Sequence, residues 1–142
     1  MAEAPQNLQN HARIDPLYHR FLVPILLLHL VYAAYNVIRR TDLETTEGLL
    51  LAIGLVVMGI LVRVNALRAQ DRVIRLEEHL RYERLGLTAK ATPLTVQQIV
   101  ALRFASDNEL PGLIDQVTTG KLQTQKEIKA AIKTWRPDYV RV

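Results

Sequence analysis

One uninterrupted stretch, residues 45–84, most constrains what this chain can fold into. It contains no proline, and residues 48–62 within it carry no charge, whereas residues 63–84 are rich in charged side chains. A helix over the whole stretch is about 60 Å long, roughly twice the thickness of the hydrocarbon core of a bilayer. The sequence therefore predicts a helix that crosses a membrane at residues 45–62 and continues outside it as a stalk, residues 63–86.

A stripe of mostly apolar residues runs along both halves of this helix in alternating steps of four and three. Its members are Gly48, Ala52, Leu55, Gly59, Val62, Ala66, Ala69, Val73, Leu76 and Leu80. Such heptad spacing is typical of coiled coils. Small residues inside a membrane let helix backbones approach closely, and larger apolar residues outside it associate by burial. We therefore expect this stripe to be the helix-association surface.

Charged residues on the stalk predict a solvated surface beside the stripe. Asp71 with Arg75 and Glu77 with Arg81 are acid–base pairs four residues apart, which is the spacing of neighbours on an exposed helix. His79 lies among these charges and is expected to be a solvated face residue.

A second apolar run precedes the long helix. Residues 21–38 are uncharged and are flanked on both sides by arginines, whose long side chains can reach lipid headgroups. The Asp15-Pro16 pair favours a helix start. We therefore expect a first membrane span at residues 17–38. A cleaved signal peptide is the alternative, although its apolar segment is shorter and ends at a small-residue cleavage site.

The connection between the two spans is short and polar, so the spans are expected to be antiparallel neighbours. Arginines near the membrane are distributed unequally, with 2 in the connection and 7 on the other side. The two are Arg39 and Arg40, and the seven are Arg13, Arg20, Arg63, Arg68, Arg72, Arg75 and Arg81. Because the side richer in basic residues is cytoplasmic, both termini are expected in the cytoplasm.

The C-terminal residues, 94–142, predict a small cytoplasmic module of three helices. Gly86 permits the left-handed backbone that ends a helix, and a linker is expected at residues 87–93. Each helix of the module is marked by a capping box, in which a side-chain cap is reciprocated three residues later. The boxes are Thr95 with Gln98, Ser106 with Glu109 and Thr124 with Glu127. The apolar faces carry Val96, Ile99, Val100 and Phe104; Leu110, Leu113, Ile114 and Val117; and Ile128, Ala131, Ile132 and Trp135.

The predicted fold class is therefore an all-α membrane protein. It is an antiparallel two-helix transmembrane hairpin, residues 15–86, whose second helix extends into a cytoplasmic stalk followed by the small three-helix module. Residues 1–14 are expected to form a flexible cytoplasmic tail. The chain has no cysteine, which excludes disulfides, thiolate metal sites and cysteine nucleophiles. No serine, histidine and acid combination converges in a predicted pocket, so we do not expect an enzyme.

Three polar residues share one face of the first span: His29, Tyr32 and Asn36. Polar groups at membrane depth are costly and point to a role. In one interpretation, His29 and Asn36 hydrogen-bond across helices. In the other, His29 belongs to a proton path or is an axial ligand of a haem or chlorophyll-type ring in an accessory subunit of a respiratory or photosynthetic complex. The second span lacks a partner histidine, which favours the first reading. No other cofactor and no metal is expected.

Basic side chains form a candidate surface for lipid or a partner. Lys126, Lys129 and Lys133 share a face of the last predicted helix, opposite Ile128 and Ile132, and Arg63 and Arg68 lie at the start of the stalk. Anionic lipid headgroups suit this surface. A membrane-tethered nucleic-acid-binding module is the alternative, although the expected helices do not include a convincing recognition helix.

Several short motifs point to a family. They are N-H-A-R at residues 10–13, Q-D-R-V-I-R-L-E-E at 70–78, A-L-R-F-A-S-D at 101–107 followed by E-L-P at 109–111, and W-R-P-D at 135–138. Over nearly its whole length the chain resembles a family of small bacterial two-span membrane proteins known only as a domain of unknown function. The resemblance implies a bacterial source and the cytoplasmic (inner) membrane, and it implies no activity.

The leading hypothesis is a non-enzymatic membrane scaffold or accessory subunit. The stalk is expected to associate through its stripe, and the cytoplasmic helices are expected to bind a partner. The implied partners are the lipid bilayer and either further copies of this chain or a larger membrane complex. Pairing along the stripe should end about one turn before Gly86, because Glu83 replaces the next apolar residue.

The predicted topology is testable with compartment-specific reporters. A reporter inserted at Thr45 should read the outside compartment, and one fused after Val142 should read the cytoplasm, because the basic residues gather on the cytoplasmic side. A cytoplasmic signal from the Thr45 reporter would contradict this topology.

Overall fold

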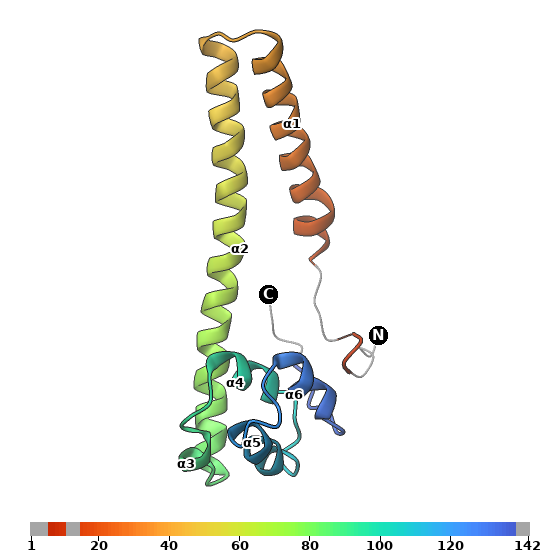
Figure 1. Ribbon diagram of the computed structural model, residues 1–142, viewed down its shortest axis with the longest axis vertical. Helices are drawn as coiled ribbons and strands as arrows, with labels where there is room; N and C mark the ends of the chain where they lie inside the picture. Colours follow the sequence, from red (N-terminus) through yellow and green to blue (C-terminus); the bar gives the residue numbers. More distant parts are fainter. Residues whose placement is uncertain (1–5, 11–14, 139–142) are drawn as a thin grey trace. The chain divides into compact units, whose positions relative to one another are not determined.

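The computed structural model describes residues 6–10 and 15–138, and the regular elements of this part of the chain are helices (Figure 1). Six α-helices follow a π-helical segment, η1, in the described residues. They are η1 Leu17–Leu22, α1 Val23–Arg39, α2 Leu43–Arg84, α3 Thr88–Ala91, α4 Val96–Leu102, α5 Leu110–Thr118 and α6 Gln125–Ala131. The all-α prediction is therefore confirmed.

The chain divides into two compact units, which we describe separately. Among the described residues, 15–67 form what we call the apolar unit. Residues 68–138, with residues 6–10, form the head unit. Helix α2 contributes to both units, because the division falls within it.

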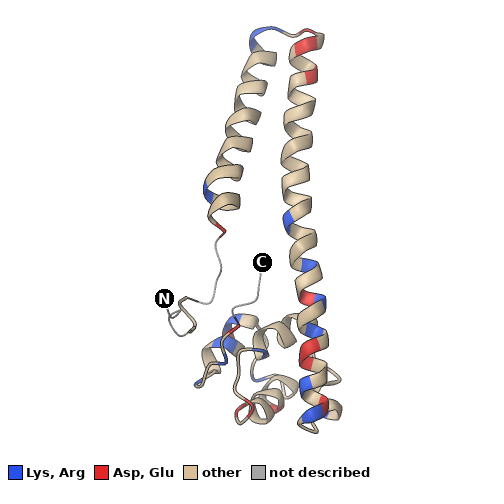
Figure 2. Ribbon diagram, turned by 180° about the vertical axis from the view of Figure 1, so that it is seen from behind, with Lys and Arg blue, Asp and Glu red and all other residues tan. Residues whose placement is uncertain are grey.

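Two helical stretches are long and apolar enough to cross a membrane, Leu17–Arg39 and Leu43–Arg84. Figure 2 shows uncharged ribbon along α1 and along the first half of α2, with acidic residues at the start of α2 and basic residues beyond the uncharged part. Because most of this apolar surface is exposed within the apolar unit, the composition of both helices suggests association with a membrane.

The start of the first helix follows from Asp15, Pro16 and Pro24. The Asp15 carboxylate accepts a hydrogen bond of 3.0 Å from the backbone N–H of Tyr18, as expected of a cap. Pro24 has no backbone N–H to offer to the carbonyl of Arg20, and the turns before it widen into the π-helix η1. The helix start is confirmed, and the π-helical segment was not predicted.

Helix α2 ends as the sequence predicts. Gly86 has a φ of +68°, and the N–H of Leu87 donates to the carbonyl of Tyr82 at 2.8 Å, which is a left-handed glycine cap. The expected linker at 87–93 is partly wrong, because α3 lies within it. Leu87 and Ala91 are buried, and this burial explains why the segment is ordered into a helix turn.

Two of the three capping boxes are confirmed, those of Thr95 with Gln98 and Thr124 with Glu127. The box of Ser106 with Glu109 is wrong, since α5 begins only at Leu110. The carboxylate of Glu109 instead accepts hydrogen bonds from the backbone N–H groups of Lys133 at 3.0 Å and Thr134 at 2.8 Å. The Glu109 side chain therefore binds a distant segment and is not available for the predicted capping box.

The last helix is shorter than predicted. It ends at Ala131, and Ile132 is already extended, so Ile132 and Trp135 do not lie on the helix. Beyond it the chain runs beside the segment after α4: Ala105 forms an antiparallel bridge with Trp135, and the N–H of Arg136 donates to the carbonyl of Phe104 at 2.7 Å. Closer to the helix end, the N–H groups of Lys133 and Thr134 donate to the Glu109 carboxylate and therefore cannot continue the helix.

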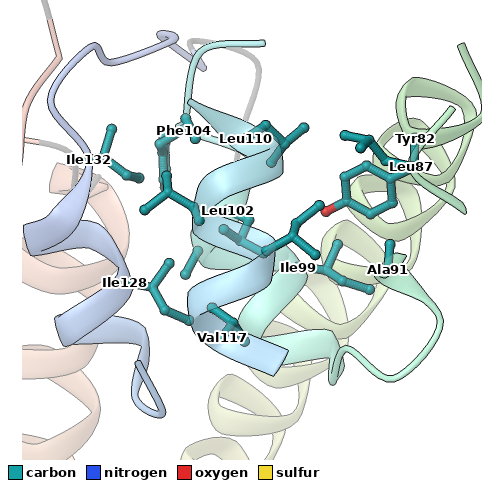
Figure 3. Close-up of a cluster of buried hydrophobic side chains, with 14 residues drawn as sticks. Tyr82, Leu87, Ala91, Ile99, Leu102, Phe104, Leu110, Val117, Ile128 and Ile132 are labelled. Atoms are coloured by element: carbon teal, nitrogen blue, oxygen red, sulfur yellow. The ribbon is translucent and has the colours of Figure 1, made fainter. Parts of the chain in front are cut away.

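One hydrophobic core holds the head unit together (Figure 3). Its buried members are Tyr82, Leu87, Ala91, Ile99, Ala101, Leu102, Phe104, Ala105, Leu110, Leu113, Ile114, Val117, Ile128 and Ile132. Figure 3 shows Tyr82 and Leu87 beside Leu110 and Ile99, with Ile128 and Ile132 on the other side. The C-terminal end of α2 is therefore part of the head core and not a free stalk.

Residues 1–14 were expected to be a flexible tail, and residues 6–10 of them are described. The side chain of Gln6 donates to the carbonyl of Asp138 at 2.8 Å and accepts from its N–H at 2.9 Å. His11 and Arg13 lie outside the described residues.

Two glycines in the head unit should respond oppositely to alanine. Gly86→Ala should lower the free energy of unfolding by about 1 kcal/mol, because alanine is strained at a φ of +68°. Gly112→Ala lies inside α5, where an added Cβ meets nothing within 4 Å; it should raise the free energy by about 0.5–1 kcal/mol. Urea unfolding followed by the fluorescence of Trp135 measures both, and equal effects would contradict the assigned conformation of Gly86.

Candidate functional site

Polar residues of α1 line a cavity in the apolar unit. The cavity has a volume of about 450 Å³. Its lining residues are His29, Tyr32, Ala33, Asn36, Arg39, Arg40, Asp42, Glu44, Thr45 and Gly48. The structure thus brings His29, Tyr32 and Asn36 together, as the sequence predicts, and adds residues of the connection and of α2.

A local hydrogen-bond network at the start of α2 borders this cavity. The Asp42 carboxylate accepts from the backbone N–H of Thr45 at 2.9 Å, and the Thr45 hydroxyl lies 2.7 Å from the carbonyl oxygen of Arg40. The hydrogen bonds from Thr45 lower the pKa of Asp42, so this carboxylate is charged at neutral pH. The cavity therefore carries fixed basic and acidic groups at the connection.

The lining side chains can form hydrogen bonds to a polar group. Among the described residues, no group of three or more histidine, cysteine or acidic side chains could hold a metal ion. His29 as an axial ligand of a tetrapyrrole stays a prediction, and so does its role in hydrogen bonding across helices.

The first members of the heptad stripe face α1 within the apolar unit. A Cβ at Gly59 would lie 3.1 Å from Cδ1 of Leu26, and the hydroxyl of Tyr18 donates to the carbonyl of Gly59 at 3.2 Å. Ala52 of α2 and Ala33 of α1 are the buried residues of this unit. The absence of a side chain at Gly59 therefore lets α1 approach α2 closely at this position.

The later members of the stripe are free in the head unit. Val73, Leu76 and Leu80 are 55%, 61% and 58% exposed, and Ala69 is also exposed. We call these four residues the exposed row. The residues of α2 that turn toward the head are instead Ile74, Glu78, Arg81 and Tyr82, all of them buried. At about 100° per residue the two sets lie on nearly opposite faces of the helix.

A buried charge network joins α2 to the rest of the head. Arg81, whose side chain is 3% exposed, donates to Glu78 at 3.1 Å, to Asp107 at 2.7 Å and to the carbonyl of Ala105 at 2.7 Å. Arg136 donates to the other oxygen of Glu78 at 3.1 Å. The expected surface pair of Glu77 with Arg81 is therefore wrong, because burial of Arg81 places it beside Glu78 and Asp107.

The two acids of the network have opposite pKa shifts. Burial raises the pKa of Glu78, against the effect of the Arg81 and Arg136 guanidinium groups. The hydrogen bond from Arg81 lowers the pKa of Asp107, whose side chain is about half exposed. The network is therefore a structural tie, since each charge has a partner within the head.

The sequence prediction missed this network, although a signal for it exists. Ile74, Glu78 and Tyr82 follow one another at steps of four, which marks a second face of the same helix besides the heptad stripe. An acid between two large apolar residues on one face indicates a buried carboxylate that requires a basic partner.

The predicted basic face does not form as expected. Lys133 lies beyond the end of α6, and Nζ of Lys129 lies 5.6 Å from the centre of the Phe104 ring, a ring of the head core. Lys126 is exposed on α6. In the apolar unit, Arg63 lies 5.7 Å from the Tyr18 ring centre, and Arg68 is exposed in the head unit. The early end of α6 separates Lys133 from the other two lysines.

His79 lies on the surface, as predicted. Its Nε2 is 3.5 Å from a carboxylate oxygen of Glu83, and both side chains are more than half exposed. His79 also borders a small cavity of about 220 Å³ together with Arg75, Tyr82, Thr88 and Thr92. Burial raises the pKa of the Tyr82 phenol on the wall of this cavity.

Comparison with known proteins assigns a family without an activity. The sequence profile of a family of unknown function, DUF6526, matches residues 1–142. No curated protein and no solved structure matches the chain.

Removing Arg81 should destabilise the head strongly. Arg81→Met leaves the buried Glu78 with only Arg136 and should lower the free energy of unfolding by about 3–5 kcal/mol. The exposed Arg75→Met is the matched control, for which a change within about 0.5 kcal/mol is expected. Urea unfolding followed by Trp135 fluorescence measures both.

The same variant should change the dependence of stability on pH. An acid whose pKa is higher in the folded protein binds more protons there, so the contribution of Glu78 to stability is greatest at low pH and falls as the pH rises above the ordinary carboxyl range. Losing Arg81 raises the pKa of Glu78 further, and the fall should be steeper in Arg81→Met. In the double variant with Glu78→Gln, the additional fall of the unfolding free energy with pH should disappear. If the additional fall persists, it comes from another titratable group.

Proposed function

Since the chain belongs to DUF6526, a family of unknown function, we propose its role from its own residues: it is a non-enzymatic membrane scaffold or accessory subunit that associates through the exposed row of α2. One observation carries this proposal. Three large apolar side chains lie in a heptad row, each more than half exposed, on the face of α2 that turns away from the head core.

We place the apolar unit across a bilayer as an antiparallel two-helix hairpin with both termini in the cytoplasm. The length and composition of the two apolar helices support this arrangement. The contacts of Tyr18 and Leu26 with Gly59 support pairing of the two helices. The excess of arginines outside the connection supports the orientation.

The free energy available to the exposed row is substantial. Complete burial of a leucine or valine side chain contributes about 1.5–3 kcal/mol, and more than half of each of Val73, Leu76 and Leu80 is still accessible. Charged residues surround the row, which is the pattern of a coiled-coil seam and not of a lipid-facing surface.

The head contributes a rigid platform beside the exposed row. Its core includes Tyr82 of α2, and the Arg81 network ties that helix to the segment after α4. A partner bound to the exposed row is thereby held at a fixed distance from the head.

A charged residue introduced into the exposed row should abolish association of the protein with its partner. Leu76→Glu should convert the complex recovered in mild detergent to the monomer, because a carboxylate in the seam opposes burial. Val96→Glu is the matched control: Val96 is also apolar and exposed but lies on α4. Light scattering after size-exclusion chromatography measures both, and unchanged mass for Leu76→Glu would overturn the proposal.

A further inference from the structure

We propose that the partner of the exposed row is a second copy of this chain, paired in parallel and in register. The inference rests on the proposed function and names its partner. Two copies held in one bilayer with the same topology necessarily present their α2 helices in the same direction. Confinement to the membrane also raises their effective concentration, which favours a short seam.

Charge complementarity beside the exposed row identifies the second copy. In the heptad abcdefg, Val73 and Leu80 take position a and Leu76 takes position d. Arg72 then takes position g, and Glu77 takes the position e that follows it. In a parallel two-stranded coil a g residue faces the e residue five places later on the partner helix. Arg72 of each copy therefore meets Glu77 of the other, which gives two ion pairs of opposite charge.

Both flanking residues are available for this pairing. Arg72 and Glu77 are exposed and flank the exposed row on its two sides. The next pair of flanking positions, His79 and Arg84, contains no acid, so Arg72 and Glu77 alone decide the register. The row itself ends where Glu83 takes the next seam position.

The position of the head is compatible with such a pair. Ile74, Glu78 and Tyr82 are buried within the head unit, on the face of α2 nearly opposite to the exposed row. In a twofold pair each head therefore lies on the outside of the two-stranded coil. The seam is limited to the exposed row, because the earlier stripe residues Ala52 and Gly59 pack toward α1 of the same chain.

The absence of cysteine from the chain permits a direct test of register. Val73→Cys places one thiol at an a position, where the two copies of a parallel, in-register coil bring the residue against itself. Mild oxidation of the full-length protein in native membranes should give a covalent dimer. Arg75→Cys, on the same helix but away from the seam, is the control and should not cross-link. Equal cross-linking of both, or of neither, would overturn the proposal.

Charge exchange tests the partner and the pairing together. Two differently tagged full-length chains are co-expressed, one carrying Arg72→Glu and the other Glu77→Arg. Each variant alone faces like charges, whereas the mixed pair has only opposite charges. With the two chains in equal amounts, random pairing gives as many mixed dimers as homodimers, and the ratio of mixed dimers to homodimers should rise at least about threefold above this value at low salt. A chain with Arg75→Glu, which makes the same charge change away from the seam, should pair at random with the wild type. Native Trp135 fluorescence checks the fold of each variant.

The outcomes separate this inference from the proposed function. In one outcome, Leu76→Glu disrupts the complex while the chains with Arg72→Glu and Glu77→Arg pair at random. The exposed row then binds a partner, but the proposed pairing of Arg72 with Glu77 is wrong. If two tagged wild-type copies do not co-purify while Leu76→Glu still lowers the mass of the complex, the partner is a different protein. If Leu76→Glu changes nothing, both proposals fail.

Discussion

The head unit depends on the burial of one guanidinium group. Arg81 donates to Glu78 on its own helix, to the carbonyl of Ala105 and to Asp107, so a single side chain links α2 to the segment between α4 and α5. A buried charge is tolerated only when its hydrogen bonds are satisfied. These partners therefore hold the rotation of α2 about its axis relative to the head, and this rotation determines which face of α2 stays exposed.

Helix α2 uses different faces for different purposes. In the apolar unit its small residues lie toward α1, where the absence of side-chain bulk at Gly59 allows close approach. In the head unit Ile74 and Tyr82 are buried in contacts with the head, and the exposed row is left over. A stripe with one spacing along the sequence thus has two environments, because its neighbours in space differ between the units.

Local signals predicted local structure well. The caps of Thr95 and Thr124 and the glycine that ends α2 involve residues within a few positions of one another, so the sequence around them is sufficient. The predictions failed where a distant segment competed. Glu109 caps no helix because it binds the backbone of Lys133 and Thr134, and α6 ends early because the same two N–H groups cannot also continue it. The shared face of His29, Tyr32 and Asn36 was predicted from their spacing, whereas the cavity that they line also requires α2 and the connection before it.

By itself, the sequence determined the helical class, the two apolar helices, the end of α2 and two of the three caps, because spacing, charge and backbone preference act over a few residues. The tertiary structure alone decided which partners the buried face of α2 meets, because those partners are distant in the sequence. Glu78 and Arg81 have the composition of a solvated stalk, and only the approach of Asp107, Ala105 and Arg136 removes them from water. The same approach leaves Val73, Leu76 and Leu80 exposed, since a helix packed on one face by its own head has the opposite face free for a partner.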